Sequence, residues 1–266
     1  MKTLFHIQTE EQDSSEDILL LEVGKDYCCL GIYNDASKAI KEIKYFTFPE
    51  TESGNALGTI LQDLEQKAYS LVKVASNYSN ALLVPSEYSK NSDTLLTTIY
   101  SGHTVEHLQD RLNNSEIITA YSFPIEVYKQ LKDSFHSVQF RHLYSCMISG
   151  NRSSSHEHIL SVHLTTTDFS VVYLKLNEVQ LAQTFSYVSA LDVVYYLLKL
   201  CFEFKLSQTD VQLFLSGLVA KDSSMYLEIQ NYFLNLKFAE QPELKLPETD
   251  HPQYFFTSLY NLAVCA

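Results

Sequence analysis

Two groups of histidines have the spacing of metal ligands. The first lies at residues 103–107, which read His-Thr-Val-Glu-His, the H-x-x-E-H pattern of inverted zinc peptidases. On a helix, His103 and His107 would lie one turn apart and could share a zinc ion. Such sites also need a glutamate ligand from a second helix, and nothing in the sequence marks one. We favour an exposed helix in a connecting segment, and we keep a metallohydrolase at His103, Glu106 and His107 as an alternative hypothesis.

The second group is His156 and His158, on either side of Glu157. Alternate residues of a strand face the same way, so both histidines could bind a metal ion. A solvated start of a strand explains the pair equally simply, and we favour that interpretation. The five cysteines have neither metal-type nor redox-type spacing, and most lie among apolar residues, as buried free thiols do. We therefore predict no metal site.

Two further segments could hold a phosphate group. One is Thr165-Thr166-Thr167-Asp168, whose hydroxyls and turn amides could bind an anion. The other is Ser216-Gly217, which follows a buried apolar run, where the carboxyl end of a parallel strand meets the ligand crevice of an α/β sheet. Threonines and an aspartate also suit a plain hairpin, and Ser-Gly suits a strand-to-helix turn. We favour these plain interpretations.

The elements that would position these segments are clearest in the second half of the chain. Strands are predicted at residues 159–164, 169–176 and 179–185, a helix at 190–204, and a fourth strand at 211–215. The fourth strand is too apolar to have a wet face, which predicts a central and parallel position. The helix is apolar over most of its circumference, with one polar stripe at Asp192, Tyr196, Lys199 and Glu203. This pattern predicts burial on several sides.

The first half begins with a weaker copy of the same plan. Strands are predicted at residues 18–23, 27–33 and 41–48, and alignment of Ile18 with Ile159 brings Asp26 within one residue of Asp168. Helices are predicted at 56–68, 94–100, 104–112 and 124–135, and short strands at 71–75, 81–84, 116–121 and 138–140. The polar run at residues 150–155 is the best linker, so we predict two domains, 1–150 and 151–266.

Composition limits the partners and the chemistry. A net charge of −13 argues against nucleic acid or an anionic membrane as a partner, because both repel an acidic surface. The N-terminal segment lacks a secretory apolar core, and the most apolar run is too short to span a bilayer, so we expect a cytoplasmic protein without membrane insertion. Only seven glycines are present, which leaves little material for phosphate-binding loops.

A three-stranded meander followed by a helix and a parallel strand, occurring twice, resembles tandem ribonuclease-H-like units, which together form the actin-like ATPase fold. The chain resembles a family of uncharacterised bacterial proteins assigned to that fold, and it is similar in plan to the cytoplasmic actin-like proteins of pilus assembly and type II secretion. The resemblance implies an α/β class and a nucleotide cleft between the halves. Two hairpins that bind phosphate would flank this cleft.

The hairpins depart from the pattern of active members, which have an aspartate at the end of the first strand followed closely by glycine and threonine or serine. The first hairpin has Glu22 near the aspartate position and retains only Gly24, followed by Lys25 and Asp26. The second hairpin, residues 162–168, has neither the aspartate nor the glycine in place. The adenosine segment has a single glycine, Gly217. These losses should weaken nucleotide binding and remove hydrolysis, because the aspartates hold magnesium and the glycines admit the phosphates.

We therefore predict a non-catalytic protein that acts through contact with a protein partner that the sequence does not name. No cofactor is predicted. The first alternative is a weak ATP-binding switch or ATPase with magnesium. Its cofactor-binding residues would be Gly24, Lys25, Asp26, Thr165, Thr166, Thr167, Asp168, Ser216 and Gly217. The sequence leaves the oligomeric state open.

Overall fold

The chain was analysed as a computed structural model, in which residues 1–10, 14–100, 104–112, 115–151, 155–239 and 245–265 are described. It divides into two compact units. The first unit contains residues 1–146, 242–250 and 262–266, and the second contains residues 147–241 and 251–261. The chain passes between the units four times, and two of these passages lie within helices, α4 (Leu143–Asn151) and α7 (Thr257–Val264).

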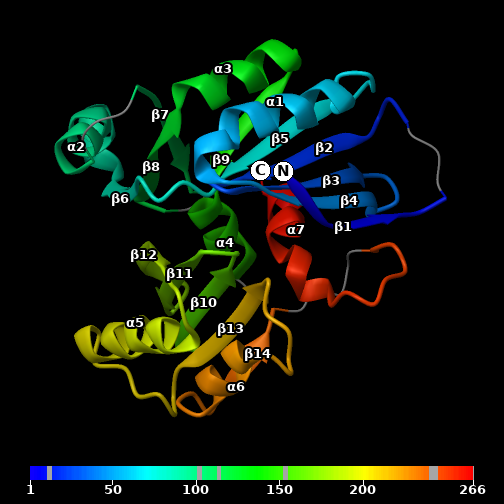
Figure 1. Cartoon of the computed structure of the whole chain (residues 1–266). Helices are drawn as coiled ribbons and strands as arrows, with labels where there is room; N and C mark the ends of the chain where they lie inside the picture. Colours follow the sequence, from blue (N-terminus) through cyan, green and yellow to red (C-terminus); the bar gives the residue numbers. More distant parts are fainter. Residues whose placement is uncertain (11–13, 101–103, 113–114, 152–154, 240–244, 266) are drawn as a thin grey trace. The chain divides into compact units, whose positions relative to one another are not determined.

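The first unit is built on a six-stranded mixed sheet (Figure 1). Its strand order is β1-β4-β3-β2-β5-β9, with β1 (Lys2–Gln8), β2 (Ile18–Val23), β3 (Tyr27–Asn34), β4 (Ala39–Thr47), β5 (Leu71–Ser76) and β9 (Val138–His142). The strands β1 to β4 pair antiparallel, whereas β5 and β9 continue the sheet in parallel. Strand β2 is buried along nearly its whole length, as its unbroken apolar run predicts for a central strand.

The same unit carries a smaller three-stranded sheet and three helices. The small sheet has the order β6-β8-β7, with β6 (Ala81–Pro85), β7 (Val105–Arg111) and β8 (Ile117–Pro124). The helices are α1 (Ser53–Leu64), α2 (Ser92–Ile99) and α3 (Ile125–Ser134), with 3-10 turns at η1 (Glu50–Glu52) and η2 (Ser86–Asn91). Pro124 is the N-cap of α3, one position before the first helical turn in which the sequence predicted it.

The helix predicted at residues 104–112 is wrong. Residues Val105–Arg111 form strand β7, which pairs antiparallel with β8 from Val105↔Pro124 to Arg111↔Ile118. A partner strand outweighs the local helical preference of this polar segment, because every ladder hydrogen bond is made with β8.

The second unit is a five-stranded sheet with helices α5 (Ala190–Glu203) and α6 (Ser224–Gln230) (Figure 1). Its strand order is β12-β11-β10-β13-β14, with β10 (His158–Leu164), β11 (Asp168–Lys175), β12 (Glu178–Ser186), β13 (Gln212–Gly217) and β14 (Leu236–Phe238). The 3-10 turn η3 (Gln253–Phe256) also belongs to this unit. Strand β13 pairs in parallel with both β10 and β14, which confirms its predicted central position.

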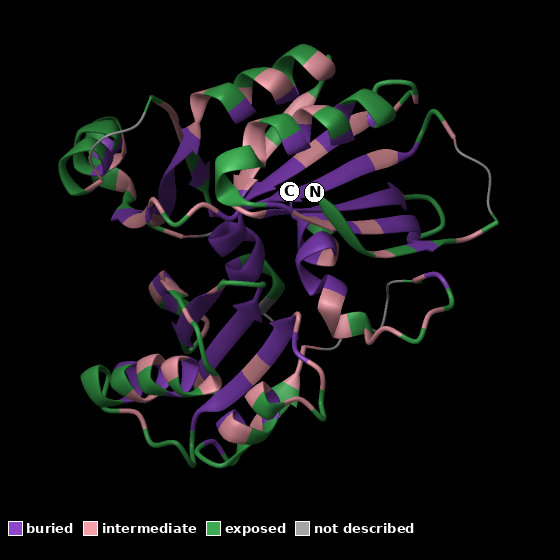
Figure 2. Cartoon of the chain, in the orientation of Figure 1, coloured by how far each residue is buried: buried purple, intermediate pink, exposed green. Residues whose placement is uncertain are grey.

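Helix α5 begins with a capping box between Ser189 and Asp192 and packs Val193, Leu197 and Cys201 into the core of this unit. Burial over most of its circumference is not observed, and that prediction is wrong. Leu191, Tyr195 and Phe202 are 59%, 59% and 80% exposed. Figure 2 accordingly shows exposed as well as buried residues along this helix. The sheet covers one face only, and the opposite face is apolar as well.

The duplication predicted from the sequence is visible in backbone hydrogen bonds. The amide of Gly24 donates to the carbonyl of Tyr27 over 3.1 Å, and that of Thr165 donates to Asp168 over 2.9 Å. The amide of Asn77 donates to Val23 over 2.9 Å, and that of Leu218 donates to Leu164 over 2.8 Å. Corresponding residues are 141 positions apart in both cases. The two hairpins are therefore built on one backbone plan.

Candidate functional site

The first hairpin joins β2 to β3 and carries Glu22 near its start. This carboxylate is 1% exposed and accepts a short hydrogen bond from the hydroxyl of Tyr27. Asn77, which directly follows β5, donates from Nδ2 to the same hydroxyl over 2.6 Å. The parallel register pairs Val23 with Ser76, so Asn77 reaches the hairpin from the carboxyl end of the neighbouring strand. The acid at the strand end is thus bound by a tyrosine, whose hydroxyl in turn accepts a hydrogen bond from an amide.

Gly24 is required by the side chain of Tyr27. A Cβ at Gly24 would lie 2.3 Å from Cε1 of the ring, far inside van der Waals contact. The ring is 2% exposed and stacks on Tyr45 with centroids 5.3 Å apart. The glycine of this hairpin therefore makes room for an aromatic ring of the protein itself.

Burial keeps the hydroxyl of Tyr27 and the thiol of Cys28 protonated at neutral pH. It raises the pKa of Tyr27 well above its usual value, and the charge of Glu22 raises it further. Tyr27 therefore remains a hydrogen-bond donor to Glu22 at neutral pH. Burial also raises the pKa of the neighbouring Cys28 thiol to about 12, so it is not a thiolate nucleophile.

Lys25 and Asp26 are the two residues at the tip of this hairpin, and both are partly buried. The carbonyl of Asp26 accepts a hydrogen bond from the amide of Phe48 over 2.9 Å. The tip is therefore tied to the chain that follows β4.

The second hairpin joins β10 to β11 and is closed by hydrogen bonds of its own and by two from the end of β12. The hydroxyl of Thr165 donates to the carbonyl of Asp168 over 2.9 Å. The hydroxyl of Ser186 donates to Oδ1 of Asp168 over 2.6 Å, and that of Tyr187 donates to the carbonyl of Thr165 over 2.5 Å. Thr166 and Thr167 are exposed at the tip. Thr165 and Asp168, the residues closest to the strands, are thus engaged within the hairpin and by the end of β12.

Ser216 and Gly217 end the parallel strand beside this hairpin. Gly217 has a φ of +80°, and a Cβ there would lie 2.1 Å from the carbonyl oxygen of Leu164. The glycine is therefore required by the close approach of two backbones. The hydroxyl of Ser216 lies 3.1 Å from Nδ1 of His163 and donates to the carbonyl of Val162 over 3.2 Å.

The structure adds three residues to the predicted set: Tyr27, Asn77 and His163. His163 occupies in β10 the position of Glu22 in β2, because the two are 141 positions apart. Both are buried at the ends of their strands. The internal alignment of Ile18 with Ile159 contains this signal, since it sets Glu22 against His163. Whether the predicted residues bind a nucleotide stays a prediction.

The histidine motifs do not assemble into a site among the described residues. His103 lies outside them, and Glu106 and His107 are neighbours on β7, so their side chains point to opposite faces of the strand. Nδ1 of His107 lies 3.2 Å from the hydroxyl of Ser122. In the second group, Nδ1 of His158 lies 3.0 Å from the hydroxyl of Tyr173. Within the described part of the chain, no three His, Cys, Asp or Glu side chains are placed to share a metal ion.

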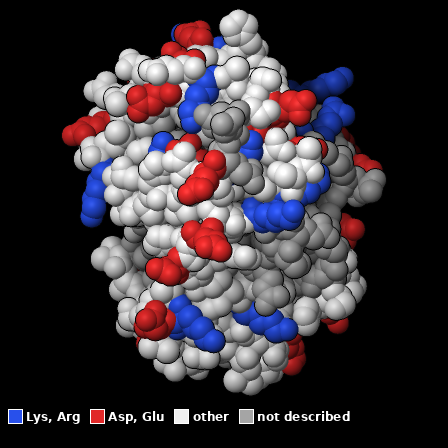
Figure 3. All heavy atoms as spheres, turned by 90° about the vertical axis from the view of Figure 1, so that its right-hand side faces the viewer, with Lys and Arg blue, Asp and Glu red and all other residues white. Residues whose placement is uncertain are grey.

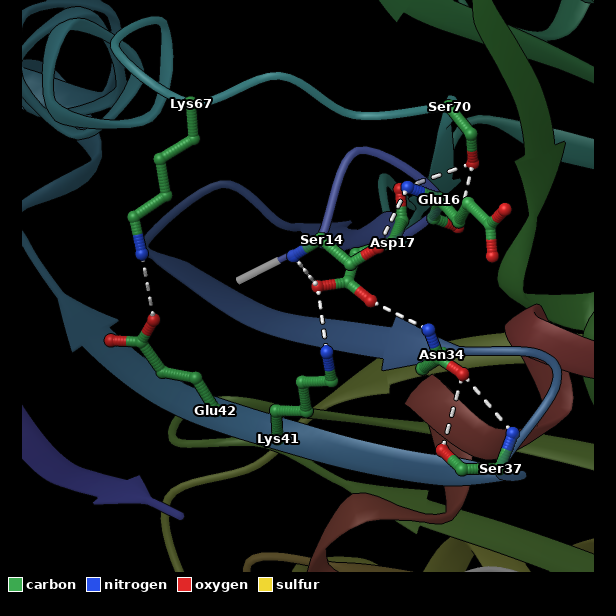
Figure 4. Close-up of polar contacts among 9 residues, drawn as sticks. All are labelled: Ser14, Glu16, Asp17, Asn34, Ser37, Lys41, Glu42, Lys67 and Ser70. Atoms are coloured by element: carbon green, nitrogen blue, oxygen red, sulfur yellow. Dashed lines mark hydrogen bonds and ion pairs between the residues drawn. The ribbon is translucent and has the colours of Figure 1, made fainter. Parts of the chain in front are cut away.

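A separate polar cluster lies at the amino end of β2 (Figure 4). Asp17, which is 1% exposed, accepts hydrogen bonds from Nζ of Lys41 over 3.0 Å and from Nδ2 of Asn34 over 2.8 Å. Burial raises the pKa of Asp17, but hydrogen bonds from Asn34, Ser14 and Lys41 outweigh burial and leave the pKa below its usual value.

Next to Asp17 is a cavity of about 300 Å³. It is lined by Ser14, Ser15, Asp17, Gln66, Lys67, Ala68 and Tyr69. Lys67 also reaches Glu42 over 3.5 Å. Because β2 and β5 run in parallel from this end, the cavity lies at the opposite edge of the sheet from the hairpin. Ligands of α/β sheets bind at the carboxyl ends of the strands, so we interpret the Asp17 cluster as structural.

Comparison with solved structures identifies the fold. A protein from Bacteroides thetaiotaomicron with an actin-like ATPase fold and unknown function matches with a TM-score of 0.78 at 14% identity, covering 95% of this chain and 97% of that one. The PilM–PilN type IV pilus biogenesis complex matches with a TM-score of 0.62 at 11% identity, covering 94% of this chain and 98% of that one. The predicted actin-like ATPase fold is confirmed, as two mixed α/β sheets with a small inserted sheet.

A third match is the ethanolamine utilization protein EutJ from Carboxydothermus hydrogenoformans, with a TM-score of 0.52 at 6% identity, covering 98% of this chain and 93% of that one. A comparison with curated proteins finds no match. At the level of sequence, residues 7–236 match DUF3822, a family described as a protein of unknown function. By that match over most of its length, the chain belongs to the DUF3822 family.

Proposed function

We propose that this chain is a non-catalytic cytoplasmic protein that has kept the actin-like fold, has lost its nucleotide chemistry and acts by binding another protein. The observation that carries the proposal is the packing of Tyr27. Its ring fills the space in front of Gly24, and its hydroxyl is bonded to Glu22. In active proteins of this fold, the acid at this position holds magnesium directly or through water. Here the acid is buried against a protein donor instead.

The second hairpin supports the same proposal in a different way. Its first hydroxyl, on Thr165, and its carboxylate, on Asp168, take part in hydrogen bonds within the hairpin and with Ser186. The approach of the Leu164 backbone is sufficient to require a glycine at position 217. The predicted cofactor-binding residues in both units thus include several that the packing of the protein itself requires.

Surface features support a role in protein contact. Most large exposed apolar side chains of the described residues lie in the second unit: Leu176, Val188, Leu191, Tyr195, Phe202, Phe204, Leu227, Tyr232 and Leu234. Leu191, Tyr195 and Phe202 share one face of α5, and exposed apolar surface of this kind is typical of protein interaction sites. On the face drawn in Figure 3, basic and acidic side chains are interspersed, as on an ordinary solvated surface. Among the described residues, the helices are too short or too polar to cross a membrane.

Thermal unfolding with nucleotides tests the proposal. A ligand present at one hundred times its dissociation constant stabilises the native state by about 2.7 kcal/mol, which raises the melting temperature by several degrees. We expect no rise with millimolar Mg-ATP or Mg-ADP. A rise that Thr165→Val abolishes would contradict the proposal, and it would support the nucleotide-binding switch in its place.

A further inference from the structure

The outward face of α5 carries an apolar seam, three of whose four residues are exposed. The seam consists of Leu191, Tyr195, Leu198 and Phe202, whose spacings of four, three and four residues are those of positions that meet in a coiled coil. Leu191, Tyr195 and Phe202 are exposed, and Leu198 is partly buried at the edge of the core. Exposure of aromatic and leucine side chains to water is unfavourable in free energy, and packing against another apolar surface would remove this cost.

The seam complements itself under a two-fold axis. If two copies of α5 pack antiparallel about the middle of the seam, Leu191 meets Phe202 of the other copy and Tyr195 meets Leu198. All four layers are then filled, because each of the two contacts occurs twice, as in an isologous interface. A 14-residue helix is about 21 Å long, which accommodates these four layers.

The charges beside the seam fit this same arrangement. Asp192 and Lys199 lie along the same edge of the helix, and the antiparallel register brings Asp192 of one copy beside Lys199 of the other, twice. In a parallel pair the edge that carries Asp192 and Lys199 would lie on the opposite side of the seam from the same edge of the other copy, so this charge pairing would be lost. Asp192 caps the helix through Oδ2, which accepts from the amides of Val188 and Ser189. A carboxylate can accept a further hydrogen bond through its other oxygen.

From this seam we infer that the chain forms a two-fold dimer through antiparallel packing of α5 against α5 of a second copy. The inference deepens the proposed function, because it assigns one contact surface and one partner. A single pair of short helices buries less than the roughly 1,200 Å² of a stable specific interface, so the dimer is weak, with a dissociation constant on the order of ten micromolar.

Sedimentation velocity over a range of about 1 to 300 μM, chosen around the affinity expected for an interface of this size, measures this equilibrium. Phe202→Glu places a charge in the seam, and Lys199→Glu sets like charges against Asp192. Each is expected to weaken the dimer at least tenfold. Their matched controls lie in the first unit. Ile99→Glu changes an apolar residue on a helix that is 56% exposed. Lys129→Glu changes an exposed lysine of a helix. Like Lys199, this lysine is followed four residues later in the sequence by an acidic residue.

Because Phe202 is 80% exposed, Phe202→Glu should leave the melting temperature unchanged, so that loss of the dimer is not loss of folding. The controls should dimerise like the unaltered chain. A chain that stays monomeric at the highest concentration would overturn the inference. A dimer that resists both seam variants would overturn it as well.

Disulfide trapping tests the antiparallel register. The five native cysteines are buried, so new thiols at the seam can be distinguished. Leu191→Cys in one copy should cross-link to Phe202→Cys in another, whereas each variant alone should not. In the antiparallel register two copies of residue 191 are displaced by about 16 Å along the helix, beyond the reach of a disulfide. Cross-linking of Leu191→Cys to itself would contradict the inferred register. Neither result depends on nucleotide binding, so this test and the test of the proposed function can fail separately.

Discussion

The two units fill the same hairpin backbone with different chemistry. In the first unit the strand-end position holds a buried acid, Glu22, covered by Tyr27. In the second unit the same position holds a buried imidazole, His163, beside Ser216. The difference extends to the cores. All buried Asp, Glu and Lys side chains of the described residues lie in the first unit: Asp17, Glu22, Lys41, Glu42 and Asp110. The second unit buries hydroxyls, amides and one imidazole.

This contrast separates the constraints that come from the backbone of the fold from those that come from individual side chains. A glycine survives in both units, but for different reasons. Gly217 is kept by the approach of two backbones, which no side-chain change can relieve. Gly24 is kept by a single aromatic ring, and its constraint disappears if that ring is removed. The constraint on Gly24 therefore depends on one side chain, whereas the constraint on Gly217 comes from the backbone of the fold.

The largest expected effect is that of Gly217→Ala. The new Cβ would lie 2.1 Å from the carbonyl of Leu164 at a φ of +80°, so β10 and β13 must separate. We expect a loss of about 3 to 5 kcal/mol in the free energy of unfolding. Denaturant titration measures this loss. Gly58→Ala in α1 is the control, because nothing lies within 4 Å of its Cβ, and it should stabilise by about 0.5 to 1 kcal/mol.

Gly24→Ala should cost about 1 to 3 kcal/mol, because the new methyl group overpacks the Tyr27 ring. Tyr27→Ala alone should cost about 3 to 5 kcal/mol through the cavity that it leaves. In the double variant the methyl group occupies part of that cavity, so the two costs should not add. A double-mutant cycle by chemical denaturation measures the coupling. Strictly additive costs would show that Tyr27 is not what requires the glycine.

The buried carboxyl group of Asp110 in the first unit should make the free energy of unfolding depend on pH. Burial raises the pKa of Asp110 to about 6, because desolvation outweighs its hydrogen bond from the amide of His142, 2.6 Å long. A carboxylate with a raised native pKa binds protons more tightly in the native state. Asp110 therefore lowers stability as pH rises from about 4 to 6, by up to roughly 1.4 kcal/mol per pH unit.

Asp110→Asn should remove this contribution. Burial lowers the pKa of His142 to about 4, and this has the opposite sign, since its contribution to stability is lost as pH falls through the same range. The difference between Asp110→Asn and the unaltered chain isolates the carboxylate. We expect the variant to gain stability relative to the unaltered chain as pH rises from 4 to 7. A difference independent of pH would contradict the assignment.

The smallest expected effect is in the second hairpin. Ser186→Ala removes the 2.6 Å hydrogen bond to Oδ1 of Asp168, which is partly exposed and can bind water instead. We expect a loss of about 0.5 to 1.5 kcal/mol, measured by thermal unfolding. A loss as large as that of Gly217→Ala would mean that side chains, and not the backbone, maintain this hairpin.

The sequence was sufficient for the duplicated plan, because apolar runs and turn residues are local signals. The parallel, central place of β13 followed from its lack of a polar face. Strand β7 could not be predicted, since its residues become a strand only through pairing with β8, and the pattern around His107 suits a helix equally. The exposed face of α5 was not predicted, because the type of an apolar residue does not show whether it is buried in the core or lies at the surface.

The candidate site was predictable in position but not in content. Glu22 and Gly24 mark the first hairpin, but only the fold brings Asn77 to the hydroxyl of Tyr27, across a separation of 50 residues. The ring of Tyr27 points back at Gly24 because of the turn between them, which no spacing rule reports. The sequence marks Gly24 as a phosphate-loop glycine, and the structure shows that the ring of Tyr27 occupies the space in front of it.

Calorimetric titration of the unaltered chain with Mg-ATP and Mg-ADP, together with a phosphate-release assay, tests the central claim most directly. If Tyr27 and the closed second hairpin have replaced the phosphate sites, no binding heat should be detected at millimolar nucleotide and no phosphate should be released. Micromolar binding accompanied by measurable hydrolysis would contradict the account.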